Sequence, residues 1–146
     1  MAPVKRGECR SSCPIANILD VVGDRWTLLV IRDMMFAGRH EFHEFANAEE
    51  GIATNILVDR LKRLLDDEII KSVPHPTNKK RKYYYLTRKG KALMPLMTEM
   101  AIWAHTYLPE VKIPKDIVRK VTKSPRTFMD EMLARLDAWE KEQGVR

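Results

Sequence analysis

The 146-residue sequence lacks the features that usually mark an enzyme, a disulfide scaffold or a membrane protein. It has two cysteines, Cys9 and Cys13, which are too few for a disulfide framework. Its six glycines are scattered and form no phosphate-binding loop, and neither a GxSxG nor an HExxH motif occurs. No apolar run is long enough to span a bilayer, and residues 1–12 lack an apolar signal core. We therefore expect a cytoplasmic, globular protein that is not an enzyme, needs no cofactor or metal and has no membrane partner.

The positive charge of the sequence is concentrated in one segment. The formal net charge is +6, yet residues 71–91 hold eight Lys and Arg and no acidic residue, so the remainder is slightly negative. The centre of this segment reads NKKRKYYYLTRKGKAL, with four basic residues running into three tyrosines. A local excess of one charge usually has a partner of the opposite sign.

Hydrophobic residues recur at helical spacing through the first half of the sequence. Asp24 is a good N-cap residue, and Pro14 suits the first turn of a helix. Gly51 can adopt the positive φ that a tight turn requires. The predicted helices cover residues 13–23, 23–38, 40–48 and 53–67. The second of them is apolar enough to lie in the centre of the core.

The pattern then changes to that of two β-strands. Residues 69–76 and 81–87 are predicted as strands that a short polar tip joins into a hairpin. Alternation places Tyr84 and Leu86 on the face opposite to Tyr83. We expect Tyr84 to pack inward beneath the preceding helix.

The last part of the sequence predicts further helices. Thr87 can cap a long helix over residues 88–108, in which Pro95 should introduce a kink. Residues 109–146 supply a proline-rich connector, with at most one irregular turn, and a last helix that begins at a Ser-Pro pair. The apolar stripe of that helix comprises Phe128, Met129, Met132, Leu133, Leu136 and Trp139. This stripe has no obvious partner in the preceding elements, so we expect it to support the core or a dimer, or to cover a small molecule.

This order of elements is that of a winged helix-turn-helix. The predicted fold is mainly α with a small β-hairpin: a winged helix-turn-helix over residues 13–108, which includes dimerisation helices, and an extra C-terminal helix. An α-helix fills the major groove of DNA, and its first residues meet base edges. A charged hairpin beside it can reach phosphates or the minor groove. The sequence therefore predicts binding to double-stranded DNA.

The candidate DNA contacts lie on the fourth helix and on the hairpin. They are Thr54, Asn55, Val58, Asp59, Lys62 and Arg63 on the helix, and Lys79, Lys80, Arg81 and Lys82 on the hairpin. Asn55 can read adenine, and the cations of the hairpin and of the Arg60 region can neutralise phosphates. Asp59 either accepts a hydrogen bond from cytosine or pairs with Arg63 or Lys62, and the pairing is favoured. The alternative is that the basic cluster faces solvent and does not contact DNA.

Four motifs in order resemble the HxlR-type winged helix-turn-helix regulators, which are relatives of the MarR group. They are Cys-Pro at 13–14, Trp-Thr-Leu-Leu at 26–29, Leu-x3-Leu-x2-Leu at 57–64 and Tyr-x-Leu-Thr-x2-Gly at 84–90. The resemblance covers residues 13 to about 108 and implies homodimers that bind DNA and repress or activate transcription. Many members have Ser at the start of the recognition helix, where this sequence has Ala53, so we expect Thr54 to take over the cap.

Cys13 is a candidate redox sensor. A cysteine at the start of a helix faces unpaired N–H groups, which favour the thiolate and therefore oxidation. The resemblance implies the same role, because some HxlR-type proteins sense oxidants or electrophiles through a cysteine at this place. Cys9 is a possible resolving partner, and Arg10 could add positive charge. The alternative is that Cys13 is a small buried residue that only packs. His40, His43 and the cysteines lack the spacing of a metal site.

The sequence thus predicts a dimeric, sequence-specific transcription regulator, and a repressor is favoured over an activator. An oxidant or a small molecule could control it. The first helix, the helix at 88–108 and the tail are the expected dimer surfaces. Two-fold symmetry would place the recognition helices about 34 Å apart, one turn of DNA. The alternative is a winged-helix module that binds other proteins and has no specific DNA site.

Overall fold

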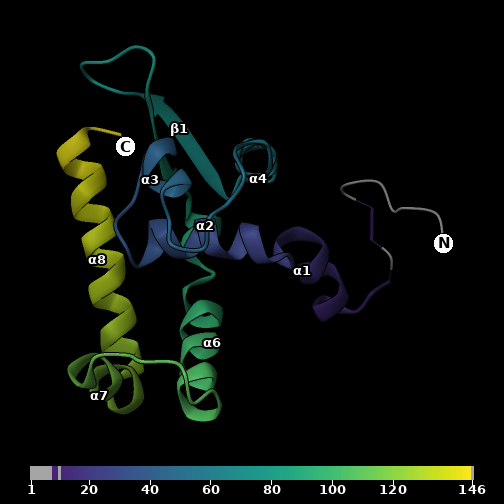
Figure 1. Ribbon diagram of the computed structural model, residues 1–146, viewed down its shortest axis with the longest axis vertical. Helices are drawn as coiled ribbons and strands as arrows, with labels where there is room; N and C mark the ends of the chain where they lie inside the picture. Colours follow the sequence, from purple (N-terminus) through teal and green to yellow (C-terminus); the bar gives the residue numbers. More distant parts are fainter. Residues whose placement is uncertain (1–7, 10, 146) are drawn as a thin grey trace.

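The computed structural model describes residues 8–9 and 11–145, which form a mostly helical fold with one two-stranded hairpin (Figure 1). The elements are α1 (Pro14–Val22), α2 (Arg25–Met35), α3 (Phe42–Ala46), α4 (Thr54–Asp66), β1 (Ile70–Pro74), β2 (Lys82–Leu86), α5 (Arg88–Lys91), α6 (Met94–Tyr107), α7 (Lys115–Lys123) and α8 (Pro125–Gln143). The order from α1 to β2 is the predicted one of a winged helix-turn-helix, and α5 to α8 follow it. No helix in the described part of the chain combines the length and apolar character that crossing a bilayer requires.

The core forms where α2 and α4 pack against the hairpin. Asp24 caps α2, as predicted, by accepting hydrogen bonds of 3.1 Å from the backbone N–H groups of Trp26 and Thr27. The buried residues of these elements include Val30, Ile31, Met34 and Met35 of α2, and Leu57, Leu61 and Leu64 of α4. The central position predicted for α2 is therefore confirmed.

The hairpin is antiparallel and pairs Ile70 with Leu86 and Pro74 with Lys82. Both strands are shorter than predicted, although the His75 N–H still donates to the Arg81 carbonyl beyond them. Tyr84 packs inward, and its ring meets that of Phe45 in α3 at a centroid distance of 6.2 Å. On the opposite face of β2, the ring of Tyr83 meets that of Trp139 in α8 at a centroid distance of 5.3 Å, so both faces of the strand contact the body.

The helix predicted at 88–108 is two helices, α5 and α6. Thr87 caps α5, since its hydroxyl accepts the Gly90 N–H at 3.1 Å. Pro95 is the second residue of α6, where its missing N–H has no intrahelical acceptor to lose. The predicted kink is therefore a break between two helices. The connector also contains the helix α7, which the sequence prediction missed.

Helix α8 runs from α7 back toward the hairpin and covers one side of the core (Figure 1). Its apolar stripe packs within the chain, which is the core support predicted as one alternative. Phe128 and Leu136 are buried, and Met129, Met132 and Leu133 pack against the core. Trp139 stacks on His40 with ring centroids 3.5 Å apart. Lys91 of α5 bonds both Asp137 and the buried Glu140 at 2.8 Å.

Candidate nucleic-acid interface

Helix α4 presents one face to the core and the opposite face to solvent. Leu57, Leu61 and Leu64 are buried. The exposed residues of the helix and its N-cap are Ala53, Thr54, Asn55, Val58, Lys62, Arg63 and, at the C-terminal end, Asp66. They include five of the six predicted DNA contacts on this helix, and the sixth, Asp59, is half-buried. The structure thus brings these side chains together on one open helix surface.

The start of α4 differs from the prediction. Ala53 is the N-cap residue, with φ −67° and ψ 142°, and no side chain caps the helix. Thr54 is already helical, so the expectation that it takes over the cap is wrong. The first N–H groups of α4 therefore have no capping side chain within the described residues. Such groups attract anions, and DNA phosphates are anions.

Asp59 and Arg60 are engaged in ion pairs within the protein. Asp59 Oδ2 lies 2.5 Å from Arg60 Nη1 and 3.1 Å from Arg63 Nε, and Arg60 Nε reaches Asp24 Oδ1 at 3.0 Å. Partial burial works to raise the pKa of Asp24, but hydrogen bonds from Thr27 and Arg60 outweigh it and lower that pKa. The pairing expected for Asp59 with Arg63 is found, whereas Arg60 joins α4 to the cap of α2 and is not free for phosphate.

The tip of the hairpin carries the basic cluster. Lys79, Lys80 and Lys82 are exposed and form no ion pair within residues 8–9 and 11–145. Arg81 differs, because its Nη2 bonds Glu41 Oε2 at 2.5 Å and so ties the hairpin to the start of α3. Below the tip, His75 Nδ1 accepts the backbone N–H groups of Thr77 and Asn78 at 3.2 Å. We call these three lysines the wing lysines. Lys79 and Lys80 stand on the turn, and Lys82 is the first residue of β2.

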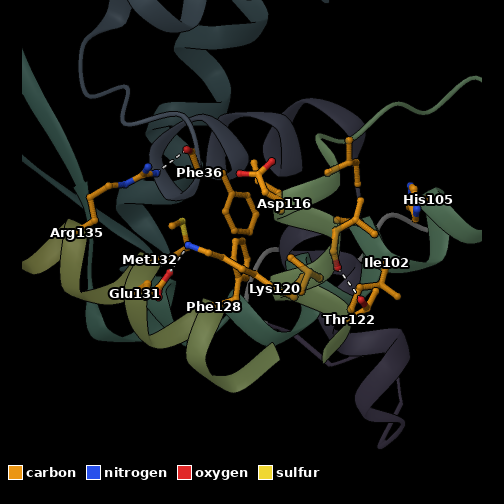
Figure 2. Close-up of a pocket in the computed structure, with 16 residues that line it drawn as sticks. Phe36, Ile102, His105, Asp116, Lys120, Thr122, Phe128, Glu131, Met132 and Arg135 are labelled. Atoms are coloured by element: carbon orange, nitrogen blue, oxygen red, sulfur yellow. Dashed lines mark hydrogen bonds and ion pairs between the residues drawn. The ribbon is translucent and has the colours of Figure 1, made fainter. Parts of the chain in front are cut away.

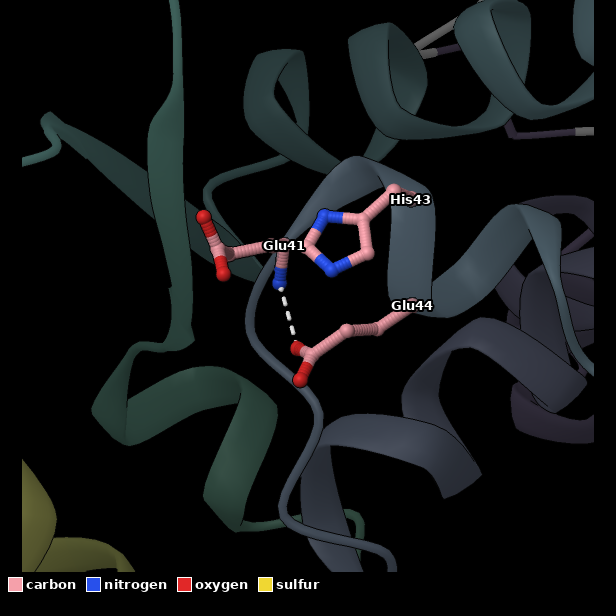
Figure 3. Close-up of side chains that lie close together, drawn as sticks. All are labelled: Glu41, His43 and Glu44. Carbon is pink, nitrogen blue, oxygen red and sulfur yellow. Dashed lines mark hydrogen bonds between the residues drawn. The ribbon is translucent and has the colours of Figure 1, made fainter. Parts of the chain in front are cut away.

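Glu41, His43 and Glu44 lie close enough together to raise the question of a metal ion (Figure 3). Their possible ligand atoms are within 4.8 Å of one another. However, Glu44 accepts the backbone N–H groups of His40 at 2.7 Å and of Glu41 at 3.0 Å, and Glu41 holds Arg81. Capping of α3 accounts for Glu44, and anchoring of the hairpin accounts for Glu41 Oε2. Glu41 Oε1 is buried without a hydrogen-bond partner among the described residues and lies 4.0 Å from His75 Nε2.

The turn before α4 is held by a group of charges that sequence reasoning missed. Arg32 donates to both carboxylate oxygens of Glu50, at 2.7 and 2.8 Å, and to the buried Asp33. Hydrogen bonds from Arg32 lower the pKa of Glu50 to about 2. Arg39 adds a second cation 3.2 Å from Asp33. Gly51 follows with φ 70°, as predicted. The turn before α4 is therefore held by the Arg32–Glu50 ion pair and by the backbone conformation of Gly51.

Cys13 is the N-cap residue of α1, with Pro14 as the first helical residue. Its side chain is exposed and makes no capping hydrogen bond to α1 among the described residues. The alternative of a buried packing residue is therefore wrong. Cys9 is exposed as well, whereas Arg10 lies outside the described residues.

Comparison with known proteins assigns the chain to a family. Residues 21–112 match the model of the HxlR-like helix-turn-helix family. The uncharacterized HTH-type transcriptional regulator Rv3095 of Mycobacterium tuberculosis is 32% identical over 100 residues, which are 68% of this chain. The match spans 62% of the length of that relative.

Two solved structures share the fold. PA1607, a candidate transcription factor, matches with a TM-score of 0.64 and 36% identity over 72% of this chain and 73% of its own. The redox regulator HypR in its oxidized form matches with a TM-score of 0.57 and 26% identity over 69% of this chain and all of its own. The family model covers more than half of the chain, and the winged fold agrees with it. The chain belongs to the HxlR-like helix-turn-helix family of transcriptional regulators.

Proposed function

We propose that this chain is the DNA-binding subunit of a homodimeric, sequence-specific transcription regulator of the cytoplasm, and that it acts as a repressor. The observation that carries the proposal is the pairing of an open recognition face on α4 with three wing lysines that have no ion-pair partner in the described residues. A repressor of this kind would act by occupying its site, which requires binding rather than catalysis.

The two elements have different tasks in this proposal. The wing lysines neutralise phosphates and supply affinity for any sequence. Thr54, Asn55 and Val58 stand at the first turns of α4 and supply specificity, with Asn55 suited to the edge of adenine. The uncapped N–H groups at the start of α4 add a phosphate contact that fixes the register of the helix.

Dimerisation is proposed from the exposed apolar residues of α1 and α6. Val22 is the one buried residue of α1, while Ile15 and Leu19 are 65% and 59% exposed. On α6, Trp103 and Tyr107 are 58% and 66% exposed. Apolar surface of this extent usually marks an interface, and a second copy of the chain covers it in a two-fold dimer.

Redox control is the regulation we propose for this dimer. Cys13 is exposed at the start of α1, beside the apolar residues proposed for the interface. One of the structural neighbours is named a redox regulator. Oxidation of the Cys13 thiol by hydrogen peroxide gives a sulfenic acid and water, and condensation with a second thiol gives a disulfide and another water. The second thiol is Cys9 or Cys13 of the second copy.

The experiment begins by selecting preferred sequences from fragmented genomic DNA and measuring binding to the best fragment and to random DNA at several salt concentrations. Changing both Lys79 and Lys80 to Ala should weaken binding to both DNAs. The slope of log affinity against log salt should flatten by about 0.9 for each lost phosphate contact. Lys115 and Lys123, exposed on α7, serve as a control pair whose replacement by Ala should leave the slope unchanged.

Asn55→Ala should weaken binding to the best fragment by about 1–3 kcal/mol and leave random DNA almost unaffected. An equal loss on both DNAs would make Asn55 a phosphate contact. If no genomic fragment is preferred over random DNA, the specific regulator is refuted, and a module that binds other proteins becomes the better assignment.

A further inference from the structure

A cavity of about 290 Å³ lies between α6, α7 and α8 (Figure 2). Its wall is largely apolar and includes Phe36, Ile102, Val121, Phe128 and Met132. The rings of Phe36 and Phe128 stack at a centroid distance of 6.2 Å. The helices α7 and α8 lie beyond residues 21–112, so this cavity depends on a segment outside the match to the family model.

Thr98 is the unusual residue of the wall. It is 2% exposed, and its hydroxyl has no hydrogen-bond partner among the described residues. Helical threonines commonly donate to the carbonyl four residues earlier, as Thr106 does to Ile102 at 2.9 Å and Thr122 to Val118 at 2.7 Å. A buried hydroxyl without a partner is costly, and a rotation about χ1 can turn it toward the cavity.

The charged residues around the cavity are at its edge and are largely committed to other partners. Lys120 pairs with Glu131 at 3.4 Å, and Arg135 Nη2 donates to the Phe36 carbonyl at 2.6 Å (Figure 2). His105 and Asp116 are exposed to solvent. A charged ligand would lose its hydration inside without gaining a dedicated counter-ion, so the cavity favours a neutral molecule.

We propose that this cavity binds a neutral, mainly apolar molecule of one or two rings that carries a hydrogen-bond acceptor, such as a ketone, for the Thr98 hydroxyl. Apolar cavities of about 150 Å³ hold a benzene molecule, so the volume here fits a ligand roughly twice that size. Ligand sites of this kind are apolar with few polar groups that fix orientation. The Thr98 hydroxyl gains its missing partner when such a ligand binds.

Contacts within the protein connect the cavity to the proposed DNA-binding elements. Phe36 is the C-cap residue of α2, and Arg135 of α8 holds its carbonyl. Further along α8, Trp139 stacks on His40, which exchanges hydrogen bonds with the backbone of Tyr84 in β2. A ligand that shifts α8 therefore shifts the support of the hairpin. This effector role rests on the proposed function, whereas the binding of the ligand does not.

Binding is tested by isothermal titration of the full chain with acetophenone and 2-acetylnaphthalene as probes. We expect saturable binding of one molecule per chain. Ala101 lines the cavity, so Ala101→Leu should fill it and lower the affinity about tenfold or more. The control is Ala134→Leu, at an exposed position of α8, which should bind as the wild type does. Absence of saturable binding, or equal binding by the Ala101 variant, overturns the proposal.

The hydrogen bond is tested with isopropylbenzene, which is close to acetophenone in size but has no acceptor. Thr98→Val should lower the affinity for acetophenone about fivefold and leave that for isopropylbenzene unchanged. Thr106→Val, on the exposed side of α6, should change neither. Equal effects of Thr98→Val on both probes would refute the role of the hydroxyl.

The effector role is tested by repeating the DNA titration with saturating 2-acetylnaphthalene. We expect the DNA affinity of the wild type to change and that of Ala101→Leu to stay constant. A bound ketone without an effect on DNA affinity overturns the effector role and leaves the site standing. A protein that binds the ketone but no DNA refutes the proposed function instead. If side chains of a second copy fill the cavity, no probe binds at any concentration that leaves the dimer intact, and the proposal fails.

Discussion

His40 combines burial with a fixed tautomer. It is 5% exposed, and its Nδ1 lies 2.9 Å from the Tyr84 carbonyl oxygen, which can only accept, so Nδ1 carries the hydrogen. The ring also stacks on Trp139. Burial lowers the pKa of His40 below 6.5, although the Tyr84 carbonyl and the carboxylates of Glu44 and Glu140 work to raise it. The folded protein therefore holds this imidazole neutral.

This residue predicts a pH dependence of stability. Since the unfolded chain binds the proton more readily, the full stability is present above pH 6.5 and is lost as the pH falls through the lowered pKa of the folded state. Urea unfolding between about pH 5 and pH 7.5 should show this slope, and His40→Asn should flatten it. Replacing the exposed His105 by Asn is the control. Identical slopes in wild type and His40→Asn would show that other groups cause the dependence.

Cys13 predicts a redox response of DNA binding. Its thiol is exposed at the start of α1, so peroxide should release the wild type from DNA, and the Cys13→Ser variant should remain bound. A gel-shift titration with hydrogen peroxide measures this. Cys9→Ser separates the two disulfides, because a bond between two copies of Cys13 survives that change on a non-reducing gel. Equal release of wild type and Cys13→Ser would make the cysteine irrelevant to binding.

At the scale of the elements, capping and turn residues predict where helices begin and where the chain turns. Asp24, Thr87 and Gly51 have the cap and turn roles expected of their residue types. Pro95 was the harder case, because a proline is compatible with both a kink and a helix start, and only the packing around α5 decides between them. The helix α7 is short and lies between prolines, so its pattern resembled a connector.

The candidate interface was predictable where it depends on helical periodicity. The exposed face of α4 follows from the spacing of Leu57, Leu61 and Leu64. The ion-pair partners of individual cations could not be predicted from helical periodicity, because they lie far away in the sequence. Arg60 pairs with Asp24, which is 36 residues away, and Arg81 pairs with Glu41, which is 40 residues away. The prediction of phosphate contacts therefore includes three lysines that are exposed and two arginines, Arg60 and Arg81, that the fold holds in ion pairs.

At the scale of the whole molecule, the exposed apolar residues of α1 and α6 predict dimer formation. Changing Leu19 or Trp103 to Asp places a charge on the proposed interface, so each variant should sediment as a monomer with an unchanged helical circular dichroism spectrum. Val58→Asp is the matched control, since Val58 is 54% exposed but lies on the recognition helix. A dimer that persists in both the Leu19 and Trp103 variants would place the interface elsewhere.

The contact between Arg135 and Phe36 has a consequence for the way the protein is made. It joins residues that are 99 positions apart, and α8 buries Leu136 in a core that α2 and α4 begin. A ribosome releases residues in order, so the winged part emerges first with this side of its apolar core uncovered. Closure of so long a loop is entropically costly and slow compared with the formation of local helices. During synthesis, the nascent chain therefore exposes an aggregation-prone apolar surface until α8 has emerged. A chaperone that binds during this interval would have its greatest effect on the yield of folded protein.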